Sequence, residues 1–116
     1  MSVFVKFEED VIDILVAGTL TPDLISSLKR DGSLVSYEYT GYGYFLKVAH
    51  TLLPETRIVC SEPMVKGTSG GIFAGFVIFI ENHQATLEGF PLYADPLPPN
   101  FRELDVHISL IGAGAA

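Results

Sequence analysis

VSYEYTGYGYFLKV, the sequence of residues 35–48, predicts a β-hairpin with a single register. Gly41 and Tyr42 occupy the two central turn positions, because a type II′ turn needs positive φ at the first of them and glycine adopts it without strain. This register gathers apolar and aromatic residues on one face and polar residues on the other, where Phe45 is the exception. A slip of one residue would scramble the two faces, so the pattern specifies the register. The expected cross-strand pairs are Thr40 with Gly43, Tyr39 with Tyr44, Tyr37 with Leu46, and Val35 with Val48.

The longest apolar run, residues 72–80, predicts a central strand that is covered on both faces. Asn82 and His83 form the expected two-residue turn into the next strand, since asparagine tolerates positive φ. This turn sets a second register. Its expected pairs are Ile80 with Ala85, Ile78 with Leu87, Phe76 with Gly89, Phe79 with Thr86, and Val77 with Glu88.

Shorter segments complete the expected sheet. Alternation predicts strands at residues 2–7 and 105–111, and a short strand is expected at residues 57–60. Pro63 is expected to interrupt this strand, which resumes at Met64 and Val65 on a sheet edge. A flexible connection is expected over residues 66–71. Residues 11–16 are ambiguous, because their β-branched side chains favour a strand whereas a single short helix is the alternative.

One helix is clearly predicted, from Thr21 to Arg30. Thr21 is a good N-cap, and Pro22 suits the first helical position because its missing N–H would be unpaired there in any case. Gly32 is expected to end the helix in the left-handed conformation. An apolar stripe should pack the helix on the sheet, and it consists of Leu24, Ile25 and Leu28.

These elements predict an α+β fold. We expect a single domain over residues 1–111, with six to seven mostly antiparallel strands and one main helix, and a flexible C-terminal tail over residues 112–116.

The charge balance limits the partners. Fourteen acidic and seven basic residues give a net charge of −7. This balance argues against nucleic acids and anionic membranes, which attract basic surfaces. It allows a basic protein partner, although acidity can also serve solubility alone. The single cysteine excludes an intrachain disulfide, and the N-terminal residues lack a signal-peptide pattern, so a cytoplasmic location is expected.

No motif in the sequence identifies a catalytic centre, a cofactor or a metal site. Three histidines, at positions 50, 83 and 107, lack the spacing of metal ligands. Cys60 is expected to be buried, as most free cysteines are. Should the chain hold a ligand pocket or be an enzyme, His50 and Cys60 are the residues expected to form it, with Tyr44 and Glu62 beside them.

Tyrosine is concentrated in the hairpin. Large rigid side chains with a polar tip suit protein interfaces, but cross-strand tyrosine pairs such as Tyr39 with Tyr44 can equally serve only to pack the sheet. The expected partner-binding residues are Tyr37, Glu38, Tyr39, Tyr42, Tyr44 and Glu62.

Three functions follow as hypotheses. The first is a small acidic protein-binding module that masks a basic partner, as toxin-neutralising immunity proteins do, an analogy that rests on charge and size. The second is a self-associating, dimeric structural domain. The third is a small enzyme or ligand-binding domain with a pocket near His50 and Cys60.

Overall fold

The computed structural model describes residues 2–111 and confirms the α+β class. It has two α-helices, α1 (Lys6–Leu15) and α2 (Pro22–Asp31), and one antiparallel sheet of seven strands. A 3₁₀ turn, Phe101–Glu103, precedes the last strand. The strands are β1 (Ser33–Tyr39), β2 (Tyr44–Ala49), β3 (Ile58–Cys60), β4 (Val65–Ser69), β5 (Ile72–Glu81), β6 (Gln84–Pro91) and β7 (His107–Leu110).

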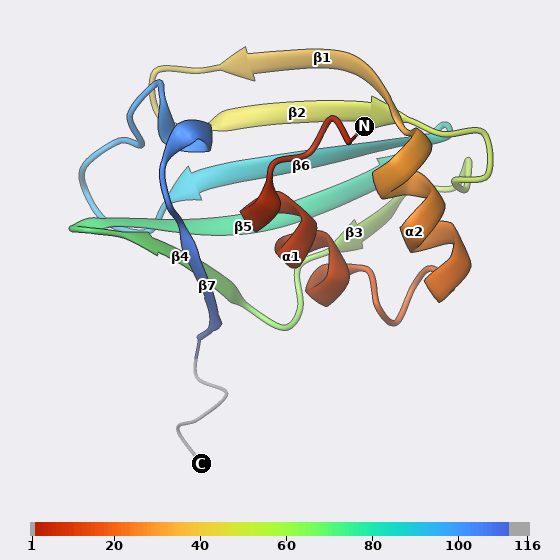
Figure 1. Cartoon of the computed structure of the whole chain (residues 1–116), viewed down its shortest axis with the longest axis horizontal. Helices are drawn as coiled ribbons and strands as arrows, with labels where there is room; N and C mark the ends of the chain where they lie inside the picture. Colours follow the sequence, from red (N-terminus) through yellow and green to blue (C-terminus); the bar gives the residue numbers. More distant parts are fainter. Residues whose placement is uncertain (1, 112–116) are drawn as a thin grey trace.

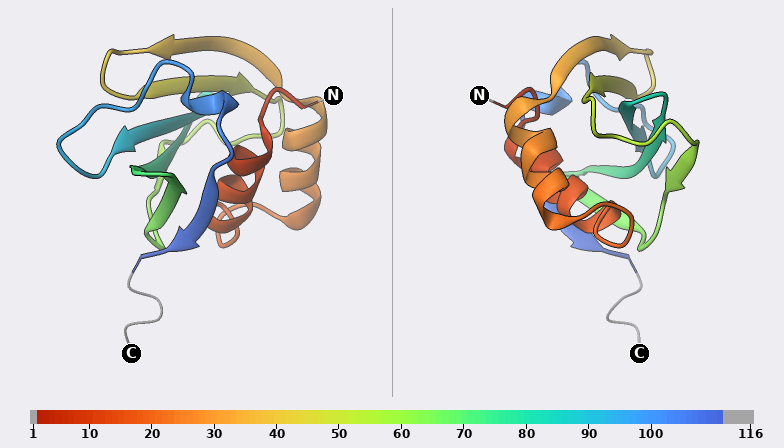
Figure 2. Two further views of the ribbon diagram at one scale, coloured as in Figure 1. Left: turned by 60° about the vertical axis from the view of Figure 1, so that its left-hand side comes forward. Right: turned by 90° about the vertical axis from the view of Figure 1, so that its right-hand side faces the viewer.

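The strands follow the order β1-β2-β6-β5-β4-β7 across the sheet (Figure 1). β3 and β4 share one side of β5, with β3 on its C-terminal half and β4 on its N-terminal half. Both helices lie on the same side of the sheet, which curves around them (Figure 2). We call this side the inner face and the opposite side the outer face.

The predicted hairpin is confirmed over most of its length. Gly41 has a φ of 85°, and Tyr39 faces Tyr44 as expected. The expected pairing of Val35 with Val48 is wrong, because a register shift between Leu34 and Ser36 leaves Val35 unpaired. Such a bulge adds one residue to one strand and changes the register beyond it.

The β5–β6 hairpin has the predicted register throughout. Asn82 and His83 have φ values of 54° and 62°, which is the positive φ that a two-residue type I′ turn requires at both central positions.

The strand predicted at residues 2–7 is wrong, because α1 begins at Lys6. Of the two alternatives for residues 11–16, the helix is confirmed, since residues 11–15 belong to α1. Phe7, Val11 and Leu15 recur every four residues and are all buried, which is a helical period. Glu8 and Glu9, which with Asp10 resemble a break between two strands, lie in the first turn of α1, where the helix dipole favours negative charge. Glu8 Oε1 also accepts a hydrogen bond of 2.9 Å from the Val5 N–H.

Helix α2 begins as predicted. The Thr21 hydroxyl accepts a hydrogen bond of 3.2 Å from the Leu24 N–H, and Pro22 is the first helical residue. The left-handed end predicted at Gly32 is wrong, because its φ is −59°. Glycine is needed there for space: a Cβ atom would lie 2.6 Å from both the Leu28 carbonyl oxygen and Val48 Cγ1.

The region after β3 also differs from expectation. The flexible connection predicted at residues 66–71 is mostly strand β4, and Gly70, with a φ of 58°, belongs to the turn into β5. β4 is not an edge strand, since β7 pairs with it. The expected tail, residues 112–116, lies outside the described residues.

The hydrophobic core lies between the helices and the inner face. Alternate residues of β5 enter it, including Phe76, Ile78 and Ile80, whereas Val77 and Phe79 point to the outer face and are half-buried. The prediction that β5 is covered on both faces is therefore wrong.

Candidate functional site

The central strands carry large apolar side chains on the outer face of the sheet, which neither helix of residues 2–111 covers (Figure 2). When one face of a sheet is exposed to solvent, the residues that point to it along each strand are normally polar. Here large apolar side chains run across the central strands, and all but Val59 are half-buried. Val59 is half exposed. By register and alternation the outer face includes Phe45, Lys47, Val59, Lys66, Phe73, Val77, Phe79, Thr86, Glu88 and Phe90, with the polar residues Ser36, Glu38, Thr68, Glu81 and Gln84 around them.

Two hollows lie on this face. The first, of about 450 Å³, has Phe45 and Phe79 among its lining residues together with the polar side chains of Glu38 and Lys47. The second, of about 390 Å³, is mainly apolar and is lined by residues that include Met64, Val77, Phe90 and Leu92. Exposed apolar surface of this kind is typical of protein–protein contact sites.

Glu88 lies between the two hollows. Its cross-strand neighbours are Phe45 on β2 and Val77 on β5, and Thr86 and Phe90 flank it along β6. Among residues 2–111 its carboxylate has neither a hydrogen bond nor an ion pair within 4.0 Å. Burial raises the pKa of Glu88 above its usual value of 4.5, because the charged form loses hydration there.

Most of the chain's basic groups are already paired with its own acids. Five of the seven basic residues contact a carboxylate, which leaves nine acids and two lysines to produce the net charge of −7. The two unpaired lysines, Lys47 and Lys66, both lie on the outer face.

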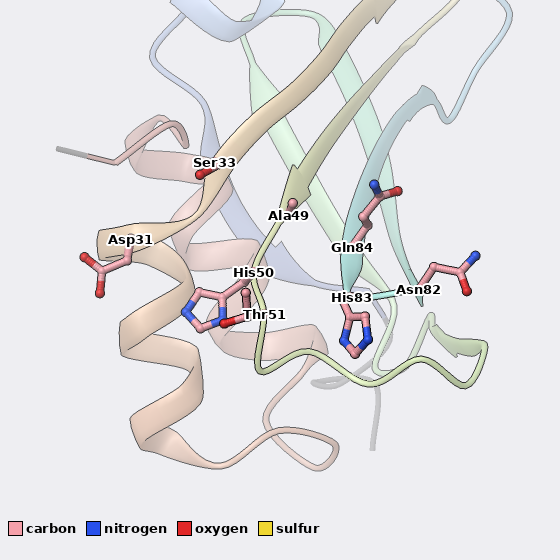
Figure 3. Close-up of a pocket in the computed structure, with 8 residues that line it drawn as sticks. All are labelled: Asp31, Ser33, Ala49, His50, Thr51, Asn82, His83 and Gln84. Atoms are coloured by element: carbon pink, nitrogen blue, oxygen red, sulfur yellow. The ribbon is translucent and has the colours of Figure 1, made fainter.

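A third hollow, of about 490 Å³, lies at one end of the sheet (Figure 3). Its lining comes from the C-terminal end of α2, the end of β2 and the turn before β6. His50 and His83 both line it. His50 Nε2 is 2.8 Å from Ser27 Oγ, and Ser27 Oγ is 3.5 Å from Asp31 Oδ2. Ser27, His50 and Asp31 resemble the nucleophile, base and acid of a catalytic triad. The positions of their protons determine whether His50 can accept the proton of the serine hydroxyl.

The hydrogen bonds of His50 are those of a structural residue. Its Nδ1 accepts from the Leu52 N–H at 3.1 Å, so the neutral ring carries its proton on Nε2 and donates to Ser27 Oγ. In this tautomer the ring cannot accept the serine proton. The Ser27–His50 hydrogen bond therefore holds α2 against the segment that follows β2.

His83 has the opposite tautomer. Its Nδ1 donates to the Leu53 carbonyl at 2.6 Å, which leaves Nε2 as an acceptor 3.8 Å from Glu55 Oε1. Within the described residues no group of three His, Cys, Asp or Glu side chains could hold a metal ion.

The predicted pocket joining His50 and Cys60 is wrong. Cys60 is buried and lines a separate hollow between β3 and the turn after α1, with Thr19 and Glu62. Its Sγ lies 3.8 Å from Thr19 Oγ1.

The hairpin tyrosines divide into two groups. Tyr37 and Tyr42 are 41% and 56% exposed, and Glu38 is exposed beside them. Tyr44 is buried, so it does not form part of a contact surface as predicted. Tyr39 donates its hydroxyl to the Leu97 carbonyl at 2.6 Å.

Glu62 does not join this group. It follows β3, on the far side of β5, whereas the hairpin forms the opposite edge of the sheet.

A buried ion pair that the sequence did not predict lies under the hairpin. Glu8 is fully buried and accepts hydrogen bonds from Arg102 Nε and Nη2, both at 2.8 Å, and from the Tyr44 hydroxyl at 2.7 Å. The hydrogen bond to Glu8 raises the pKa of Arg102. Burial, together with the Glu8 carboxylate, raises the pKa of Tyr44 well above 10.0. The one local signal was the place of Glu8 in the first turn of a helix with a regular apolar period.

No known protein family, curated protein or solved structure matches the chain. Within residues 2–111, no helix has the length and hydrophobicity needed to cross a membrane. The expectations of a cytoplasmic location and of no cofactor stay predictions.

Proposed function

We propose that this chain is a small acidic protein-binding module that masks a basic protein partner, as an inhibitor or an immunity-type protein would. The observation that supports the proposal best is the outer face of the sheet, where half-buried aromatic and aliphatic side chains surround two hollows without a covering layer. Burial of such a surface drives protein association, and its aromatic content suits the centre of an interface.

The net charge supports a basic partner. Since five of the basic side chains pair with the chain's own carboxylates, nine acids and two lysines remain. Both lysines lie on the outer face, so most of the excess negative charge surrounds that face rather than lying on it. A partner of opposite net charge would be attracted over about 10 Å at moderate salt, which speeds encounter.

A second candidate function is self-association through the free edge of β1. Leu34, Val35 and Tyr37 on this strand are 55%, 48% and 41% exposed, and an unpaired strand edge can pair with another chain. Two copies with a charge of −7 each repel one another, so we rank this candidate below a basic partner.

Affinity capture from the source organism tests the proposal with matched variants. Thr86→Lys places a cation at the centre of the outer face, and Thr51→Lys makes the same change at an exposed loop residue outside that face. A basic protein should be enriched by the wild type and by Thr51→Lys, lost with Thr86→Lys, and weakened at higher salt. Equal capture by the two variants would exclude the outer face as the binding surface.

Light scattering of the purified chain tests the second candidate. A dimer that dissociates with Leu34→Lys and persists with Thr86→Lys would favour the β1 edge over the outer face.

A further inference from the structure

We propose that Glu88 is the receptor for one arginine side chain of the partner, whose guanidinium pairs with the carboxylate and stacks on Phe45 while the flanking partner residues enter the two hollows. This inference rests on the proposed function and specifies the chemistry of its central contact.

The first observation is the position of Glu88. It stands in the middle of the outer face, with Phe45, Val77 and Phe90 among its four nearest positions on the sheet. A carboxylate so placed loses part of its hydration, which raises its pKa, and it has no ion-pair or hydrogen-bond partner among residues 2–111. An unpaired carboxylate between apolar side chains at the centre of an uncovered sheet face is a candidate for ion pairing with another molecule.

The second observation is that the chain itself twice combines an arginine, a glutamate and an aromatic ring. Arg102 pairs with Glu8 and lies over the Tyr37 ring, 5.5 Å from its centroid. Arg57 lies 3.6 Å from Glu81 and 5.4 Å above the centroid of the Phe79 ring. Planar guanidinium groups suit both contacts at once.

Glu88 and Phe45 present the same glutamate and aromatic ring without the arginine. The chain's remaining arginine, Arg30, pairs with Asp31 at the end of α2. Lys47, diagonal to Glu88 on β2, forms no ion pair with it. Among residues 2–111 no arginine or lysine pairs with Glu88, and the net charge of −7 favours a basic protein as the source of such a cation.

The size of the hollows suggests what flanks the arginine. One hollow of about 450 Å³ and one of about 390 Å³ lie on either side of Glu88, and their walls include aromatic rings. The hollow of about 450 Å³ is lined mostly by polar side chains, so it suits a polar partner residue, whereas the hollow of about 390 Å³ is mainly apolar and suits an apolar one. An apolar side chain in the second hollow would exclude water from the ion pair and strengthen it.

The test uses the tripeptide acetyl-Leu-Arg-Leu-amide and its citrulline counterpart, which is neutral and nearly the same shape. Each is titrated into the ¹⁵N-labelled chain and followed by amide chemical shifts. The arginine peptide should shift the amides around Phe45, Val77 and Glu88 to saturation, and the citrulline peptide should bind about tenfold more weakly.

Two variants locate the contact. Glu88→Gln keeps the shape of the side chain, and Glu103→Gln makes the same change at an exposed residue of the 3₁₀ turn, outside the outer face and both hollows. We expect Glu88→Gln to weaken binding of the arginine peptide about tenfold and Glu103→Gln to leave it within about twofold. The pKa of Glu88, followed by carboxyl ¹³C shifts, should fall when the arginine peptide is bound.

Equal binding of the arginine and citrulline peptides, or equal loss in the two variants, would overturn the arginine site. The capture experiment would still report separately on the outer face as a binding surface, because it detects binding of a partner to that face whether or not an arginine pairs with Glu88.

Discussion

Glu8 and Arg102 form a bidentate ion pair that joins the first helix to the segment before the last strand. Arg102 Nε and Nη2 each donate a hydrogen bond of 2.8 Å to the carboxylate, and the two residues are 94 positions apart in the chain. The Tyr44 hydroxyl completes the network from β2. Three distant segments are thus joined at one buried charge beneath the exposed hairpin edge.

Loss of the Arg102 cation should strongly destabilise the fold. Arg102→Met leaves a buried carboxylate without its counter-ion, which typically costs about 3–5 kcal/mol. The exposed Arg57–Glu81 pair is the matched control, and Arg57→Met should cost less than about 1 kcal/mol. Urea unfolding of both variants measures the difference. Equal losses in the free energy of unfolding would mean that the buried Glu8–Arg102 pair stabilises the fold no more than the exposed pair does.

The Tyr44 hydroxyl should contribute both a hydrogen bond and a pH dependence. Tyr44→Phe removes a donor to a buried carboxylate and should cost about 1–2 kcal/mol. Since the pKa of Tyr44 is raised well above 10.0 in the folded chain, the unfolded state loses this proton first. The stabilising effect of Tyr44 is therefore complete below about pH 10 and declines above it. Thermal unfolding from pH 8 to 11 should show a steeper decline for the wild type than for Tyr44→Phe.

Glu88 should make the isolated chain less stable at neutral pH. Its folded-state pKa is raised above 4.5, so the unfolded state ionises first and folding becomes less favourable as the pH rises above about 4.5. Glu88→Gln removes this penalty and should raise stability at pH 7 by roughly 0.5 kcal/mol or less. The gain should vanish below about pH 4. A destabilised Glu88→Gln variant at pH 7 would indicate that the carboxylate supports the fold.

Gly32 should be intolerant of any side chain. An added Cβ would lie 2.6 Å from the Leu28 carbonyl oxygen and from Val48 Cγ1, so Gly32→Ala should cost about 1–3 kcal/mol. Gly18→Ala is the control, since a Cβ there meets nothing within 4 Å. Denaturation midpoints that fall equally in both variants would argue against the close approach of α2 to β2.

Local chemistry explains which parts of the fold were predictable. Gly41 and Asn82 determine two tight turns, and each turn determines a register. The Thr21 cap likewise depends on neighbouring residues alone. By contrast, the bulge at Val35 has no strong local signal, and the alternating residues before Phe7 concealed the helical period of α1.

The candidate site was less predictable, because it is defined by an outer sheet face that residues 2–111 leave without a covering layer. The apolar run over residues 72–80 predicted cover on both faces, and the inner half of that prediction matches the buried Ile78 and Ile80. Sequence alone does not reveal whether the second cover belongs to the same chain or to another molecule. The exposure of Tyr42 follows from its turn position, which the sequence does predict.

Lysine acetylation in the presence and absence of the captured partner tests the binding surface most directly. The two unpaired lysines, Lys47 and Lys66, lie on the outer face, and Lys6 lies on α1 with 82% of its side chain exposed. We expect the partner to protect Lys47 and Lys66 from acetylation and to leave the rate at Lys6 unchanged. Protection of Lys6 with unchanged rates at Lys47 and Lys66 would contradict binding at the outer face.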